Sequence, residues 1–181
     1  MKPRILVVYF TRTGHTKQVA HSIAAALEAD TEEIADPTTR SGVRGYLRSG
    51  FEAAFKRPVP IGPAVHDPAQ YELVIVGTPI WNMSVSSPVR SYLDRHHGNL
   101  RGVAFFCTCG GQGGERAFAQ MADVCGAKPA ATLIVREADV EGSAPAVERF
   151  AAELRQALVS ATPPPPTAPL RVVVGPAAPK P

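Results

Sequence analysis

Residues 5–16 have the sequence ILVVYFTRTGHT, an apolar run followed at once by three threonines and a glycine. Six consecutive apolar residues, several of them β-branched or aromatic, predict a strand over 5–10 that is buried on both faces. From residue 15 to 27 the apolar side chains recur at helical spacing, as at Val19, Ile23 and Leu27, which predicts a helix directly after the turn. A strand that passes through a short polar turn into a helix begins an α/β unit.

The same pattern returns along the chain. Residues 72–77 and 103–107 are two further strong strand candidates, and each is followed by turn-forming residues and a helical stretch. The first of these helices begins at Ser87-Pro88, because proline suits the first helical turn. Residues 31–35 and 131–135 are weaker strand candidates, residues 144–158 form the last predicted helix, and the spacing also favours a helix over 43–55. This alternation predicts an α/β domain over residues 1–160 with a parallel sheet.

Composition and charge exclude several classes of protein. The 181 residues carry 19 Lys and Arg against 16 Asp and Glu, a net charge of +3 that is too small for a dedicated nucleic-acid binder. Because residues 161–181 hold Arg171, Lys180 and no acid, the rest of the chain carries only 3 − 2 = +1. Apolar runs fall far short of the ~20 residues of a membrane span, and residues 5–10 are too short for a signal peptide. We therefore expect a cytoplasmic protein.

The end of the chain differs in composition. Residues 163–181 contain 8 of the 18 prolines, so we expect the tail over 161–181 to be extended or disordered. The apolar residues 170–174 within it could instead add a strand to a partner, and an interaction module acting through this tail stays open as a function.

Some reactive side chains carry no signal of chemistry. The three cysteines (Cys107, Cys109 and Cys125) match neither a disulfide framework nor a zinc motif, so we expect no metal. His96 and His97 are adjacent, cannot face one ligand on a helix, and are expected at the surface. Arg40, Arg44 and Arg48 would form one stripe of a helix, which is either a solvated basic face or a docking patch for an anion such as a dinucleotide phosphate.

Ligands of parallel α/β sheets bind beyond the carboxyl ends of the strands, where three segments are informative. Residues 11–16 place hydroxyls and a glycine at a helix start, whose N–H groups suit a phosphate, although capping by Thr13 or Thr16 would use the same residues. Residues 77–88 contain the single tryptophan, Trp81, which could stack on a planar ligand or pack back onto the core. Residues 108–114 contain four glycines, which bring amides close to a ligand or form a flexible turn.

Together these segments resemble the flavodoxin family. The resemblance rests on residues 7–16, 75–81, 105–111 and 44–51, and it extends from about residue 4 to residue 158. It implies a flavodoxin-like doubly wound α/β fold, with a five-stranded parallel sheet in the order 2-1-3-4-5 that binds FMN.

The resemblance also implies the binding residues. The FMN phosphate would lie against Thr11, Thr13, Gly14, His15 and Thr16. The isoalloxazine ring would contact Pro79, Ile80, Trp81, Asn82 and Met83, and its other edge would contact Thr108, Cys109, Gly110, Gly111 and Gly113. This sequence has His15 where Asn is commoner, and its backbone amide can still serve the phosphate. It has Met83 where Gly is common, and a missing glycine there would hinder the peptide flip that stabilises the semiquinone in classical flavodoxins. No side chain is assigned as catalytic.

The resemblance favours an FMN-dependent oxidoreductase that takes electrons from a reduced nicotinamide, NAD(P)H, or from a reductase. The acceptor would be a quinone, another small molecule or a protein, and a homodimer stays open. The alternative is a non-enzymatic flavodoxin-type carrier between protein partners. Classical carriers are strongly acidic, whereas this domain is nearly neutral, so we expect a less negative reduction potential. A signalling receiver would need aspartates where Thr11 and Thr78 stand, and a Cys-x5-Arg phosphatase loop is absent.

Overall fold

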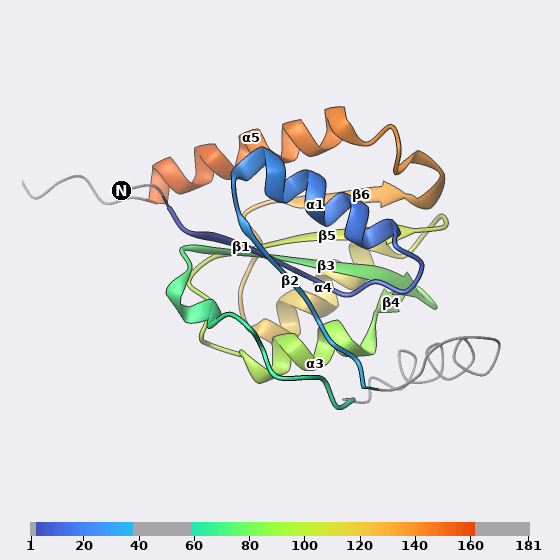
Figure 1. The fold of residues 1–181 in the computed structure, drawn as a ribbon, viewed down its shortest axis with the longest axis horizontal. Coiled ribbons are helices and arrows are strands. Elements are labelled where there is room, and N and C mark those ends of the chain that lie inside the picture. Colours follow the sequence, from blue (N-terminus) through green and yellow to red (C-terminus); the bar gives the residue numbers. More distant parts are fainter. Residues whose placement is uncertain (1–2, 38–58, 162–181) are drawn as a thin grey trace, which may run out of the picture.

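The computed structural model describes residues 3–37 and 59–161, which form an α/β fold around one parallel sheet (Figure 1). The strand order is β2-β1-β3-β5-β6, with all neighbouring pairs parallel. This arrangement confirms the predicted order 2-1-3-4-5, with β5 and β6 as its last two members. The strands are β1 Ile5–Tyr9, β2 Asp30–Glu33, β3 Leu73–Trp81, β5 Val103–Cys109 and β6 Thr132–Arg136.

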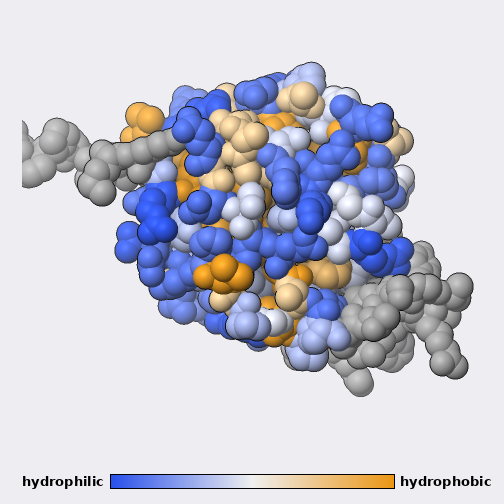
Figure 2. Space-filling model, in the orientation of Figure 1, coloured by the Kyte–Doolittle hydropathy of each residue, from blue (hydrophilic) through white to orange (hydrophobic). Residues whose placement is uncertain are grey.

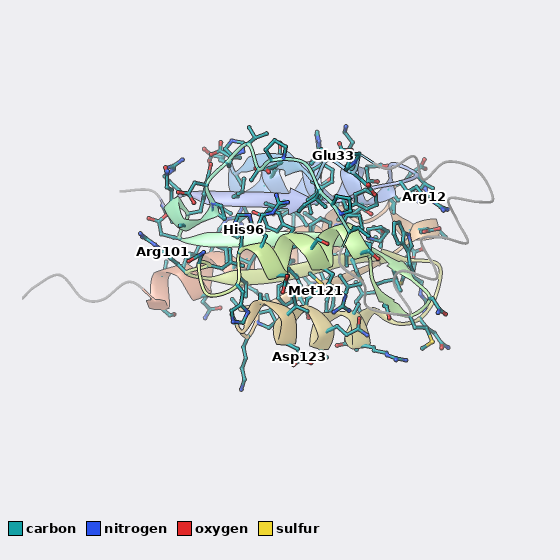
Figure 3. All side chains as sticks on the ribbon, turned by 90° about the horizontal axis from the view of Figure 1, so that it is seen from below. Arg12, Glu33, His96, Arg101, Met121 and Asp123 are labelled. Atoms are coloured by element: carbon teal, nitrogen blue, oxygen red, sulfur yellow. The ribbon has the colours of Figure 1, made fainter. Side chains whose placement is uncertain are left out.

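Helices cover both faces of the sheet. α1 (His15–Leu27) and α5 (Ala144–Ala161) pack together on one face, and α3 (Ser87–Arg95) and α4 (Gly114–Cys125) lie side by side on the other (Figures 1 and 3). Short 3-10 helices span Pro68–Gln70 and Glu137–Asp139. The prediction for α1 is confirmed at both ends, and α3 begins at Ser87 with Pro88 in its first turn, also as predicted. The predicted helix over 43–55, the arginine stripe and the proline-rich tail lie outside the described residues.

Two apolar layers hold the sheet between the helices. The central strands β1, β3 and β5 are buried along almost their whole length, as predicted for strands with helices on both faces. Of the outer strands, β6 alternates between exposed and buried side chains and β2 buries only Glu32, which explains their weaker sequence signal. α4 shows the same division, with Met121 facing the sheet and Asp123 facing outward (Figure 3). The face in Figure 2 is mainly hydrophilic, with apolar residues scattered over it.

Strands β3 and β5 run further than the sequence predicts. β3 continues through residues 78–81 and β5 through 108–109, beyond the predicted strand ends at 77 and 107. Gly77 is needed for packing rather than for a turn, because a Cβ at this position would overlap the ring of Phe106 on the neighbouring strand. β3 then turns back on itself into β4 (Ser84–Val85), a two-residue antiparallel strand that the sequence did not predict.

The paired histidines differ from each other. His97 is exposed, as predicted, but the prediction is wrong for His96, whose ring lies 4.5 Å from that of Tyr92 and is half-buried. Burial, and secondarily the charge of Arg95, lowers the pKa of His96. All three cysteines are free and buried. None of the described helices is long and apolar enough to cross a membrane.

Candidate cofactor-binding site

The turn between β1 and α1 leaves the first helical amides without helical partners. Gly14, with φ +95°, is the N-cap of α1, and no side chain caps the helix. The Gly14 amide donates to the Thr11 hydroxyl at 3.0 Å, which closes the turn. The first helical bond runs from Gln18 N to Gly14 O at 3.0 Å, so the amides of residues 15–17 precede it. Neither Thr13 nor Thr16 caps the helix, because Gly14 is the N-cap. The amides of residues 15–17 are therefore left to donate to an anion.

His15 lies at the rim of this turn between a hydroxyl and an acid. Its Nδ1 is 3.4 Å from Thr13 Oγ1 and 3.9 Å from the Glu137 carboxylate. Both His15 and Glu137 are substantially exposed, so solvent weakens their attraction. Nothing in the sequence pointed to Glu137, because this residue follows β6, three strands away from β1 in the sheet.

Thr16 points inward and connects the first segment to the third. Its Oγ1 lies 2.7 Å from Thr108 Oγ1 on β5, and each residue is only 1% exposed. The two threonines, 92 positions apart, form one buried hydroxyl pair. One hydroxyl must donate to the other, which leaves the second hydrogen for a further acceptor. This pair fixes the start of α1 against the carboxyl end of β5.

The second segment is a β-hairpin rather than an open loop. β3 ends at Trp81, Asn82 and Met83 form the turn, and β4 pairs back with Ile80 and Trp81. Both turn residues have positive φ, +46° and +58°, which is the conformation of a type I′ turn. Met83 thus adopts a backbone conformation that favours glycine, and its side chain is 45% exposed.

Trp81 packs onto the protein core. It is 9% exposed, and its ring meets Phe10 edge-to-face with 5.6 Å between centroids. This arrangement matches the second of the two roles left open by the sequence, a tryptophan folded back onto the core. Stacking of Trp81 on a flavin remains a prediction.

The third segment meets the hairpin at Gly113. Gly113 has φ +102° and caps α4, and a Cβ there would lie 2.7 Å from the Met83 Cα and 3.1 Å from Ile80 Cγ2. Gly110 and Gly111 are exposed between β5 and this cap, whereas Cys109 is the last residue of β5 and is 1% exposed. Cys109 is therefore shielded from solvent at the end of β5 rather than placed on a loop.

Polar residues outside the predicted set hold the hairpin in place. At its base, the Ser86 amide donates to Thr78 Oγ1 at 3.1 Å, and the two hydroxyls lie 3.0 Å apart. At its side, Gln120 of α4 accepts from the Val85 amide and donates to Ser84 Oγ, both at 3.3 Å. The turn-forming residues around Thr78 and Ser86 indicate that the chain reverses there. Nothing in the sequence around Gln120 indicates that it contacts the hairpin.

The predicted binding residues thus meet at one edge of the sheet. The turn after β1, the hairpin after β3 and the glycines after β5 all follow the carboxyl ends of neighbouring strands, and Arg12 marks this end in Figure 3. The arrangement fits a mononucleotide, because unbonded helix amides can take the phosphate while a hairpin and a glycine turn can approach a planar ring. Within residues 3–37 and 59–161, no group of three His, Cys, Asp or Glu side chains could hold a metal.

Known proteins support this interpretation. A flavodoxin family model matches residues 4–134. A protein of Cupriavidus metallidurans named NAD(P)H dehydrogenase (quinone) is 28% identical over 127 residues, which cover 63% of this chain and 61% of that protein. This chain therefore matches about three fifths of that relative's length.

Solved structures share the fold. A flavoprotein from Bacteroides uniformis has a TM-score of 0.70 at 20% identity, covering 83% of this chain and 98% of that one. A flavoprotein from Lactobacillus acidophilus in complex with FMN has a TM-score of 0.65 at 18% identity, covering 77% and 97%. The two-electron reduced flavodoxin of Megasphaera elsdenii has 0.54 at 16%, covering 84% and 98%. With the family model spanning most of the chain and FMN supported as the cofactor, this protein belongs to the flavodoxin family.

Proposed function

We propose that this protein is an FMN-dependent oxidoreductase that passes electrons from a reduced nicotinamide or a reductase to a quinone or another acceptor. The observation that carries the proposal is the junction of three segments at the sheet edge. The start of α1, which no side chain caps, lies next to the Thr16–Thr108 pair, and Gly113 lies against the hairpin. FMN would supply the electron-transfer chemistry, and the protein would bind and orient it.

Each segment has its own part in the proposed binding. The amides of residues 15–17 would take the phosphate, assisted by the Thr11 and Thr13 hydroxyls and by His15. The hairpin from Pro79 to Met83 would present its backbone to the isoalloxazine ring. Residues 108–113 would border the opposite edge of the ring, where Gly110 and Gly111 are exposed.

Two further observations favour an enzyme over a carrier. The name of the Cupriavidus metallidurans relative includes both a nicotinamide and a quinone, which suggests the donor and the acceptor. The whole chain has a net charge of +3, whereas a carrier that docks on basic reductases benefits from an acidic surface. A cytoplasmic location, which rests on the sequence, is part of the same proposal.

Anaerobic spectroscopy tests the proposal directly. The purified full chain is reconstituted with FMN, and its visible spectrum is recorded before and after addition of NADH or NADPH. Bleaching of the bound flavin by either nicotinamide, followed by reoxidation with a soluble benzoquinone, is the expected result. Binding without bleaching would favour the non-enzymatic carrier, and failure of well-folded protein to bind FMN would overturn the proposal.

A further inference from the structure

Arg90 is a cation buried behind the candidate flavin hairpin. It lies in the first turn of α3, only 9% exposed, and its Nη2 donates to Gln120 Oε1 at 3.1 Å. Its Nε is buried and has no hydrogen-bond partner in the part of the chain that the structure describes. Burial lowers the pKa of Arg90, and no carboxylate of residues 3–37 or 59–161 contributes to that shift. Arginine nevertheless stays charged at neutral pH, so a positive charge is held here by a neutral amide.

Such a charge is unfavourable for folding taken alone. Among the described residues, Arg90 has no partner of opposite sign. A buried ion in that situation loses solvation that one neutral hydrogen bond does not replace. A methionine of similar length would fill the same space without this loss. An arginine at this position therefore suggests a role in which its charge is used.

Gln120 connects this charge to the hairpin. Its Oε1 accepts both from Arg90 and from the Val85 amide, and its Nε2 donates to Ser84 Oγ. Val85 pairs with Ile80, one of the residues predicted to contact the flavin ring. Two hydrogen bonds thus connect the Arg90 guanidinium to β4, and β4 pairs with the end of β3 that is predicted to contact the ring. Ser84 and Val85 are both buried, so water screens this path poorly.

We infer that Arg90, held by Gln120, favours reduced FMN over oxidised FMN at this site. The inference rests on the proposed function. A hydride carries two electrons and one proton from the reduced nicotinamide to FMN, which adds one negative charge to the flavin and leaves the donor as the oxidised, positively charged nicotinamide. A fixed cation in a weakly screened environment attracts the charged product more than the neutral reactant. Arg90 would then act on the potential, while Gln120 positions both the cation and the hairpin.

The test compares the affinities of oxidised and reduced FMN. For each variant, the dissociation constant of oxidised FMN is measured by fluorescence quenching, and the two-electron midpoint potential of the bound flavin is measured against a reference dye. Together these give the ratio of the two affinities, and a tenfold change in that ratio is a shift of about 30 mV. We expect Arg90→Met to reduce the preference for reduced FMN at least threefold and Arg90→Lys to retain most of it.

Gln120→Glu provides a second variant that keeps Arg90. A carboxylate at this position can still accept from Arg90 and from Val85, but it neutralises the cation, so we expect the same loss of preference. The matched control is Arg116→Gln, which removes an exposed arginine from the first turn of α4 and should leave the ratio within twofold of wild type.

The outcomes separate this inference from the proposed function. If Arg90→Met and Gln120→Glu bind FMN with the wild-type ratio, the inference is wrong and the proposed function stands. If wild-type protein binds no FMN, both fail. A purely structural Arg90 would instead make Arg90→Met less stable in urea without moving the potential, whereas we expect its urea midpoint to be equal to or above that of wild type. Should Arg90→Met fail to fold, Gln120→Glu and Arg90→Lys still decide the outcome.

Discussion

Replacement of Gly113 by alanine should disturb the junction between the glycine turn and the hairpin. Gly113 combines two features that a side chain does not tolerate. Its φ of +102° is a conformation that L residues rarely adopt, and its Cβ would lie 2.7 Å from the Met83 Cα. Because the obstructing atom belongs to the backbone, rotation of a side chain cannot relieve the overlap. The hairpin or the start of α4 must move.

The expected loss of stability follows from these two costs. A left-handed backbone conformation costs an L residue about 1–2 kcal/mol. Overpacking that forces a backbone shift adds about 1–3 kcal/mol. The sum is about 2–5 kcal/mol, a large part of the roughly 5–15 kcal/mol by which a domain is stable.

Gly14→Ala is the matched control for this prediction. Gly14 also caps a helix with positive φ, at +95°, but nothing beyond its chain neighbours lies within 4 Å of where a Cβ would stand, so only the conformational cost of about 1–2 kcal/mol applies. Urea unfolding of the FMN-free proteins, followed by circular dichroism, measures both losses. With a slope of about 2 kcal/mol/M, the midpoint should fall by about 1–2.5 M for Gly113→Ala and by about 0.5–1 M for Gly14→Ala.

The comparison between the two variants decides whether the close approach is real. Equal midpoint shifts would show that the Gly113–Met83 contact has no energetic consequence and that the hairpin does not pack tightly against the glycine turn. A larger loss for Gly113→Ala, together with weaker FMN binding, would support it.

Three further predictions each concern the replacement of a single side chain. Thr16→Val should lower the free energy of unfolding by about 1–3 kcal/mol, because it leaves the buried Thr108 hydroxyl without its hydrogen-bond partner. Replacing both Thr16 and Thr108 by valine should cost less stability than the sum of the two single changes, as measured in a double-mutant cycle by urea unfolding. Met83→Gly should stabilise the protein by about 1 kcal/mol by removing the strain at φ +58°, measured as a higher thermal midpoint. Burial, and secondarily the charge of Glu33, raises the pKa of Tyr9 to about 12, above its unfolded value of 10. Between pH 10 and 12 the folded protein therefore binds more protons than the unfolded chain, and its stability should fall as the pH rises across that range. Tyr9→Phe should lack this part of the pH dependence in urea titrations.

The local sequence was sufficient to predict the architecture. Strands buried on both faces need continuous apolar runs, and residues 5–10 and 103–107 have them regardless of their neighbours. The apolar spacing from His15 to Leu27 likewise predicted α1 with its observed bounds. Because the carboxyl ends of parallel strands lie at the same edge of a sheet, the three candidate binding segments could also be located.

The details of the site depend on contacts between distant parts of the chain. Pro79 indicates a turn locally, but pairing with β5 extends β3 through it. Trp81 could have faced a ligand, but Phe10, directly after β1, provides an apolar surface for it. The Thr16–Thr108 bond and the link from Arg90 through Gln120 to Val85 likewise join separate elements. Hydropathy and propensity act over a few neighbouring residues, whereas packing and hydrogen bonding in the folded chain select among the conformations that those neighbours allow.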